Sequence, residues 1–193
     1  MINKKQIEYY NENGFLVVEN LIPKDTLYNI QNITKEFVNK SAIKKLSDDV
    51  YDLSDDHSKD NPKLRRLKNP HLIHEVYKNI TKDDCILNVV ENLIGKNIRR
   101  DHTKLNFKAA KGGEAIEWHQ DWAFYPHTND NIVEVGIFLD DCYEDNGPLM
   151  AVPGSHKGPI DDHHYKENFI GAVDPSLSNY DISSAVPFLA KAG

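Results

Sequence analysis

The chain has 193 residues, a formal net charge of −7, and an ordinary globular composition with 39% hydrophobic and 27% charged residues. This length suffices for one domain with a sizeable core, whereas the acidic balance, without any basic stripe, argues against nucleic acid as a partner. No apolar run reaches the roughly 18 residues of a membrane span, and the first residues lack the apolar core of a signal peptide. Two distant cysteines, Cys85 and Cys142, suggest a reducing compartment, so a soluble cytoplasmic protein is expected.

Four segments in the first half of the chain carry helical patterns. Apolar residues recur there at spacings of three and four, as they do on the buried face of a helix. The expected helices are residues 3–13, 23–40, 70–80 and 83–94. Gly14 and Gly95 follow two of them as expected helix ends, and Thr81 is the expected cap before the last one.

Two segments interrupt this helical half. Residues 15–18 are consecutive apolar residues and predict a short buried strand. The stretch 41–69 is polar and rich in Asp, Ser and Lys, so we expect a long surface loop with weak structure and a candidate lid over a site.

The second half of the chain has the pattern of strands. The expected strands are residues 98–108, 115–121, 132–140 and 149–152, with a last one beginning near Val186. Turn signals separate them at Gly112-Gly113, at residues 128–131 and at Asn146-Gly147-Pro148. Helices followed by antiparallel strands predict the α+β class.

The segment Trp118-His119-Gln120-Asp121-Trp122 is the most informative part of the sequence. On a strand, residues two apart point to the same face, so His119 and Asp121 can bind one metal ion. A His and a carboxylate are two of the three protein ligands in non-haem iron oxygenases. A His-x-Asp pair also occurs by chance in a chain with nine His, and a hydrogen-bonded surface pair explains the spacing equally well.

Further blocks surround this pair in a definite order. They are His102–Lys108 before it, and Val135–Asp141, Asn146–Pro148 and Pro153–Gly158 after it. In the order and spacing of these blocks, the chain resembles the phytanoyl-CoA dioxygenase family. The resemblance implies a double-stranded β-helix (a cupin-like jelly roll) with N-terminal helices. It also implies an Fe(II)- and 2-oxoglutarate-dependent dioxygenase that uses O2 to hydroxylate a small organic or acyl substrate.

The resemblance also assigns residues to the site. His119 and Asp121 would be the first two iron ligands and the catalytic pair, and Lys104, Gln120 and Gly136 the cofactor-binding positions. Lys104 is explained equally well as a solvated lysine on a strand. Gln120 falls on the opposite strand face, where it would shape the barrel wall. Gly136 stands where some relatives carry a Trp that packs on the cofactor, so the pocket is expected to be roomier there, or filled by a neighbouring side chain.

Other polar residues have two interpretations each. Arg65, Arg66 and Lys68 are candidates to contact an anionic substrate or cosubstrate, or form a solvated basic face. In the loop after the metal motif, Tyr125, His127 and Asn129 are candidates for substrate contact, and the solubility of an exposed loop explains them equally well. His156 is expected to be structural, with a hydrogen bond inside its Pro-Gly-Ser-His turn.

The third iron ligand is missing from the recognised blocks. In this family a distal His completes the site, and an Arg soon after it binds the far carboxylate of 2-oxoglutarate, which suits the planar guanidinium. No Arg follows Arg100 in this chain. We therefore expect residues 1–193 to be a single, C-terminally truncated domain whose last barrel strands are missing. Such a domain would expose a sheet edge and be marginally stable alone, or be completed by a partner.

Two alternatives to the dioxygenase stay open at this point. Without the full triad, the chain could be a non-catalytic β-helix binding protein. It could also be a cupin-type hydrolase or isomerase with His163 or His164 as the third metal ligand. A requirement for 2-oxoglutarate separates the dioxygenase from the hydrolase, and metal affinity separates both from the binding protein. The sequence leaves the substrate and the oligomeric state open.

Overall fold

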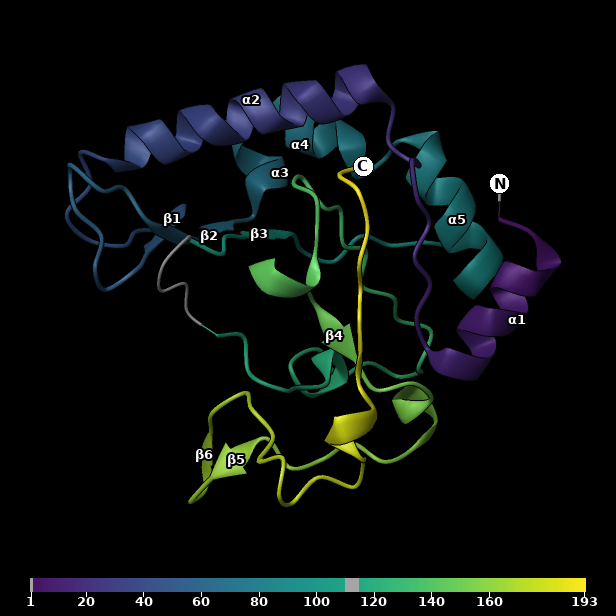
Figure 1. The fold of residues 1–193 in the computed structure, drawn as a ribbon. Helices are drawn as coiled ribbons and strands as arrows, with labels where there is room; N and C mark the ends of the chain where they lie inside the picture. Colours follow the sequence, from purple (N-terminus) through teal and green to yellow (C-terminus); the bar gives the residue numbers. More distant parts are fainter. Residues whose placement is uncertain (1, 110–114) are drawn as a thin grey trace.

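The computed structural model describes residues 2–109 and 115–193. Its helices lie in the first half of the chain, together with two short strands, and its other strands lie in the second half (Figure 1). The helices are α1 (Lys4–Asn13), α2 (Lys24–Ser41), α3 (Pro70–Ile73), α4 (Glu75–Ile80) and α5 (Asp84–Ile94). The helices predicted at 3–13, 23–40 and 83–94 are confirmed. The one predicted at 70–80 is split into α3 and α4, because His74 has an extended backbone. Within the described ranges, no helix has the length and apolar character needed to cross a membrane.

The helix ends follow from local side-chain chemistry. Asn3 and Gln6 form a reciprocal capping box at the start of α1, and Gly14 ends that helix with a left-handed φ of 83°. The cap predicted at Thr81 is wrong, because the side chain of Asp83 accepts the hydrogen bond from Cys85 N at the start of α5. Thr81 instead lies at the end of α4.

The strands are short and form three small antiparallel sheets. They are β1 (Tyr51–Leu53), β2 (Leu64–Lys68), β3 (Lys104–Asn106), β4 (Met150–Ala151), β5 (His164–Tyr165), β6 (Asn168–Phe169) and β7 (Val186–Pro187). The sheets have the orders β1-β2-β3, β4-β7 and β5-β6. Over the described residues these sheets do not close into a barrel, so the double-stranded β-helix remains a prediction.

The expectation of a weakly structured loop over residues 41–69 is wrong. This stretch contributes β1 and β2, and Tyr51, Leu64 and Leu67 from it are buried in one apolar cluster. Its few apolar residues stand among many Asp, Ser and Lys, and their buried positions do not alternate regularly, so neither average polarity nor period-2 spacing predicts these strands. Phe37 of α2 packs against the same cluster and attaches the sheet to the helices.

The predicted strands of the second half are longer than the observed ones. Only 104–106 of the segment 98–108, and 150–151 of the segment 149–152, are strand, and the segments 115–121 and 132–140 contain none. Apolar alternation predicts an extended backbone, but a strand also needs a neighbouring backbone along its length. The strand predicted at 15–18 lacks such pairing as well. The turn predicted at Gly112-Gly113 lies outside the described residues.

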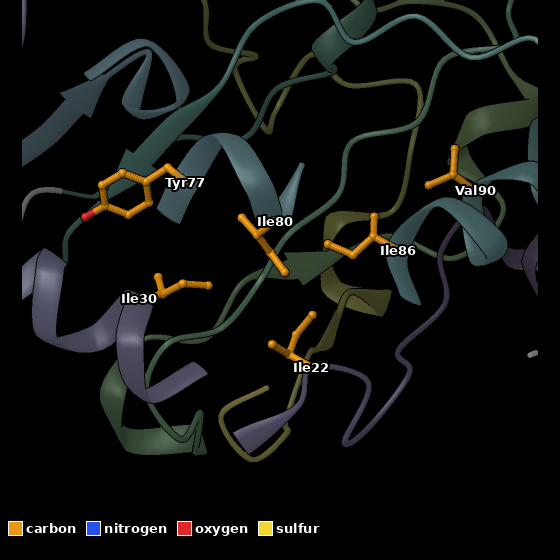
Figure 2. Packing of buried hydrophobic residues seen from close by; sticks show 6 residues of the cluster. All are labelled: Ile22, Ile30, Tyr77, Ile80, Ile86 and Val90. Atoms are coloured by element: carbon orange, nitrogen blue, oxygen red, sulfur yellow. The ribbon is translucent and has the colours of Figure 1, made fainter. Parts of the chain in front are cut away.

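The main core lies between the helices and the extended segments that cross them. Figure 2 shows its buried members Ile22, Ile30, Tyr77, Ile80, Ile86 and Val90. They come from α2, α4, α5 and the segment before α2. From the extended segment 132–140, Val133, Ile137 and Leu139 pack against this core. The alternate residues of that segment are therefore free to face the other side.

The C-terminal segment 186–193 joins distant parts of the chain, as its long course through the middle of Figure 1 shows. Its main-chain contacts are Phe188 with Leu149, Cys142 with Ala190, Gly193 N with Phe138 O, and Ile22 N with Gly193 O. The strand predicted to begin near Val186 is confirmed as β7. This segment connects the region before α2 with the extended segment 132–140.

Truncation of Leu67 should reveal the contribution of the sheet cluster. Leu67 is fully buried, so Leu67→Ala is expected to lower the free energy of unfolding by about 2–5 kcal/mol, through lost burial and a residual cavity. Leu46→Ala is the matched control, because Leu46 is 81% exposed, and it should change stability by less than about 0.5 kcal/mol. Urea unfolding measures both, and equal effects would contradict the assigned packing.

Candidate functional site

His119 and Asp121 face each other in the structure. The distance from His119 Nε2 to Asp121 Oδ1 is 3.5 Å, and both side chains are partly buried. They do not lie on a strand, because Asp121 begins a 3-10 turn that runs to Ala123. The strand argument was therefore wrong in its geometry, although the two side chains do converge.

A main-chain contact orients the imidazole ring. His119 Nδ1 lies 2.7 Å from the carbonyl oxygen of Glu117, which can only accept, so Nδ1 carries the hydrogen. Nε2 is then directed at the carboxylate of Asp121. In a neutral ring, Nε2 and the carboxylate are both acceptors, and a cation between them satisfies both.

The electrostatics of the pair agree with this geometry. The contact with Asp121 raises the pKa of His119 against the opposing effect of burial. The same contact lowers the pKa of Asp121, and the charge of Lys104 contributes to the lowering. The site therefore favours a positive species between the two groups, whether a proton or a metal ion.

Lys104 and Glu134 border the pair. Lys104 Nζ, on β3, lies 3.9 Å from Asp121 Oδ1 and 3.8 Å from Glu134 Oε1. Burial raises the pKa of Glu134. The predicted cofactor position Lys104 is thus brought to the candidate site, where its ammonium can attract a carboxylate ligand.

The donor set fits part of an iron site. One imidazole nitrogen and one carboxylate oxygen match two of the three ligands of the 2-His-1-carboxylate arrangement. The Nδ1 contact to a backbone carbonyl is the kind of support that orients metal-bound histidines. Across the residues that the structure describes, no cluster of three or more His, Cys, Asp or Glu side chains is arranged to hold a metal ion.

Gln120, the residue between the two candidate ligands, forms hydrogen bonds through both its main chain and its side chain. Gln120 N donates to His163 Nε2 at 2.9 Å, and Gln120 Oε1 accepts from Asp161 N at 2.7 Å. Gln120 Nε2 donates to Pro159 O at 3.2 Å. The amide of this predicted cofactor position is therefore engaged with the segment 159–163, in agreement with a wall role.

His163 and His164 are not arranged as metal ligands. His163 is 2% exposed, and its Nδ1 lies 2.8 Å from Asp161 O while Nε2 accepts from Gln120 N. Neither of its nitrogens is left for a metal. His164 Nδ1 contacts Asp162 at 2.8 Å on the surface. The interpretation of either residue as the third ligand is therefore wrong for this structure.

Asp161 anchors the segment that holds Gln120. Its carboxylate accepts hydrogen bonds from Ser178 Oγ at 2.7 Å and from Asn179 N at 3.1 Å. Burial by itself raises the pKa of Asp161, but the hydrogen bonds from Ser178 and Asn179 outweigh it and lower the pKa. A further contact from Val173 N to Trp118 O, at 2.8 Å, attaches the following segment to the motif.

Phe124 forms an apolar wall beside the candidate ligands. Its ring meets His119 edge-on at a centroid distance of 5.6 Å and Phe169 at 5.1 Å. A side chain at Gly171 would collide with this ring. Sequence reasoning missed Phe124, Glu134 and Asp161. Only Glu134 had a signal, since it alternates with the core-facing residues of 132–140.

The space at Gly136 is open. No atom outside its chain neighbours lies within 4 Å of the position that a Cβ would take. Within the described residues no neighbouring side chain fills this position, and Gly136 is exposed, so the roomier pocket expected here stays a prediction. Gly136 lies two residues after Glu134 on the segment that borders the site.

The basic residues of β2 are engaged away from the candidate ligands. Arg65 contacts Asp52, Arg66 contacts Asn106, and Lys68 donates to Asp48 O. These contacts agree with a solvated basic face. A cavity of about 390 Å³ beside α3 and α4 is also separate from the candidate ligands, since its lining includes His71, Lys78 and Arg100 but neither His119 nor Asp121.

The loop after the metal motif contacts the segment before β3. The ring of Tyr125 packs on His102 at 4.3 Å, and His127 Nε2 lies 3.3 Å from Arg99. Asn129 Oδ1 accepts from Asn131 N within its own turn. Tyr125 and His127 thus attach this loop to the segment before β3, whereas Asn129 is engaged locally.

His156 has a structural contact, but not inside its turn as predicted. Its Nε2 lies 3.2 Å from Asn11 O at the end of α1, 145 residues away in sequence. Gly14 must lack a side chain here, because a Cβ would collide with the His156 ring. The Pro-Gly-Ser-His turn therefore docks on the end of α1, which no local pattern could predict.

Comparison with known proteins agrees with these features. The profile of the phytanoyl-CoA dioxygenase (PhyH) family matches residues 10–193. The chain belongs to this family. It is 36% identical over 184 residues to a probable alpha-ketoglutarate-dependent hypophosphite dioxygenase of Stutzerimonas stutzeri, covering 94% of this chain and 63% of that protein. It is also 36% identical over 104 residues to the L-proline trans-4-hydroxylase of Streptomyces griseoviridis, covering 51% and 39%.

The fold of this family member is shared with solved structures. The crystal structure of EctD from S. alaskensis with bound Fe matches with a TM-score of 0.75 at 21% identity, covering all of this chain and 66% of EctD. The chain thus spans less than two thirds of the length of each of these three proteins.

Replacement of Asp161 should test the anchoring of the motif. Asp161→Ala removes the acceptor of the Ser178 hydroxyl and of Asn179 N, whose hydrogen bonds are partly buried, so stability should fall by about 1–3 kcal/mol. Asp162→Ala is the matched control, because its side chain is 79% exposed, and it should leave stability nearly unchanged. Urea unfolding at pH 7 compares the two.

The pH dependence adds a second check on Asp161. Its pKa is lower in the folded protein than the ordinary 3.8, so its stabilisation is complete above that value and is lost as the pH falls through the folded pKa. The difference between the wild type and Asp161→Ala should therefore shrink in acid. A difference that grows in acid would contradict the assigned hydrogen bonds.

Proposed function

We propose that this protein is an Fe(II)- and 2-oxoglutarate-dependent dioxygenase that oxidises a small molecule, with His119 and Asp121 as two of its iron ligands. One observation carries the proposal: His119 Nε2 and Asp121 Oδ1 face each other at 3.5 Å, with His119 Nδ1 held by Glu117 O. Two acceptors in this arrangement suit a divalent cation.

The names of the relatives support the same chemistry and bear on the substrate. The Stutzerimonas protein is named for dependence on alpha-ketoglutarate and for hypophosphite, and the Streptomyces protein for proline. The EctD crystal contains Fe. Each of the two named substrates is small. We therefore assign a small substrate, and a cupin-like jelly-roll domain that includes residues 1–193, to this protein.

The residues around the ligands have distinct parts in this proposal. With the metal and cosubstrate bound, iron(II) supplies the redox chemistry that couples oxidative decarboxylation of 2-oxoglutarate to substrate oxidation by O2. Lys104 places an ammonium beside the ligands, where it would attract a carboxylate of the cosubstrate. The open space at Gly136 leaves room for the cosubstrate or substrate. The Phe124 ring shields His119 from water on one side.

A binding protein without catalysis is the second candidate. The observation that favours it is the donor set, since the described residues bring together only one His and one carboxylate at the candidate centre. Such a protein would bind 2-oxoglutarate or a substrate analogue without releasing succinate. The hydrolase alternative loses its basis, because His163 and His164 have other partners.

Replacement of either ligand should abolish coupled turnover. His119→Ala and Asp121→Ala are each expected to reduce 2-oxoglutarate-dependent succinate release by at least about 100-fold, because each removes a metal donor. Succinate formation under O2, with Fe(II) and hypophosphite or proline as trial substrates, is the measurement. The metal-free variants should keep the far-UV circular dichroism of the wild type.

Glu117→Ala is the matched control for these variants. Glu117 precedes His119 by two residues and contacts it only through the main-chain carbonyl in the bond that orients the ring. Loss of its carboxylate should therefore leave turnover close to that of the wild type. Retained succinate release in His119→Ala, or its complete loss in Glu117→Ala alone, would contradict the ligand assignment.

A further inference from the structure

The main-chain N–H of Gln120 is one of the points at which the metal motif is attached to the rest of the protein, and it lies between the two candidate ligands. This group donates to His163 Nε2 at 2.9 Å. The two residues are 43 positions apart in sequence. A displacement of His163 would therefore move the backbone that carries His119 and Asp121.

Both ring nitrogens of His163 are engaged in hydrogen bonds. Its Nδ1 donates to Asp161 O at 2.8 Å, and a carbonyl can only accept, so Nε2 is left as the acceptor that Gln120 N requires. The ring is 2% exposed, in contact with the edge of Phe124 and stacked on Phe169. Its orientation is thus determined by two hydrogen bonds and by packing.

The backbone of His163 is also anchored. Its carbonyl oxygen accepts hydrogen bonds from Ile170 N at 2.9 Å and Gly171 N at 3.2 Å, which belong to the chain leaving the small hairpin β5-β6 (Figure 1). The hairpin therefore fixes the position from which the His163 ring reaches the motif.

We propose that His163 is a positioning residue for the His119–Asp121 pair, which sets the separation and direction of the two metal donors through Gln120 N. This inference rests on the proposed function. His163 does not touch the metal in this account; it acts through the backbone between the ligands. Residues that orient metal ligands typically change metal affinity by about 10- to 100-fold when they are replaced.

The test compares His163 with its neighbour. His163→Leu keeps the bulk of the side chain but removes the acceptor, whereas His164→Leu is the matched control, because His164 contacts Asp162 on the surface. The probe is Mn(II), which accepts the same nitrogen and oxygen ligands as Fe(II) and is stable in air. The two tryptophans of the chain, Trp118 and Trp122, both flank the motif, so quenching of tryptophan emission reports binding there.

We expect His163→Leu to lose affinity for Mn(II) while it stays folded. The dissociation constant for Mn(II) should rise about 10- to 100-fold in His163→Leu and stay at the wild-type value in His164→Leu. Tryptophan emission of the metal-free protein should shift in the first variant and not in the second. Equal Mn(II) affinity in wild type and in folded His163→Leu would overturn the positioning role.

A second pair of variants applies where His163→Leu does not fold. The amide of His163→Gln can reach Gln120 N, whereas that of His163→Asn is one methylene shorter and can reach only the partner of Nδ1. Mn(II) affinity should be largely restored in the Gln variant and weak in the Asn variant. Equal affinities in this pair would also overturn the proposal.

A failure of the proposed function would give a different result from a failure of the positioning role. If His119→Ala binds Mn(II) as tightly as the wild type, the metal is not held by the motif, and both proposals are wrong. If His119→Ala loses binding while all His163 variants retain it, the metal site stands and only the positioning role is overturned.

Discussion

The extended segment 132–140 is shared by the helical core and the candidate site, and the arrangement of both depends on it. Its residues alternate, so that Val133 and Ile137 pack on the core while Glu134 reaches Lys104 beside the ligands. The chain end holds this segment in place through Gly193 N and Phe138 O. A shift of the segment by one residue would therefore exchange core and site faces together.

The candidate centre combines a preorganised pair of donors with a rigid support. The ring of His119 is oriented by a carbonyl two residues before it, and the backbone after it is fixed through Gln120. A buried carboxylate, Asp161, then attaches that support to a further segment of the chain. Each of these hydrogen bonds is made to a group that is itself fixed by a further contact. The metal-binding atoms of His119 and Asp121 therefore need little reorganisation to receive a cation.

Sequence reasoning succeeded where the information is local. The periodicity and glycine end signals of α1 and α5, and the pairing of His119 with Asp121, could all be found within a few residues. It failed where partners lie far away. The sheet β1-β2 is stabilised by apolar residues scattered in a polar stretch, and His163 contacts Gln120 although the two are 43 positions apart in sequence. No local pattern distinguishes such a buried histidine from a metal ligand.

The most direct test of the account is an anaerobic titration of the protein with Fe(II) and 2-oxoglutarate, followed by visible absorption. A bidentate 2-oxoglutarate chelate on iron(II) gives a charge-transfer band, and the account predicts that the band forms in the wild type and is lost in both His119→Ala and Asp121→Ala. Absence of the band in the wild type, or a band that survives in either variant, would contradict the assignment of these two residues as iron ligands.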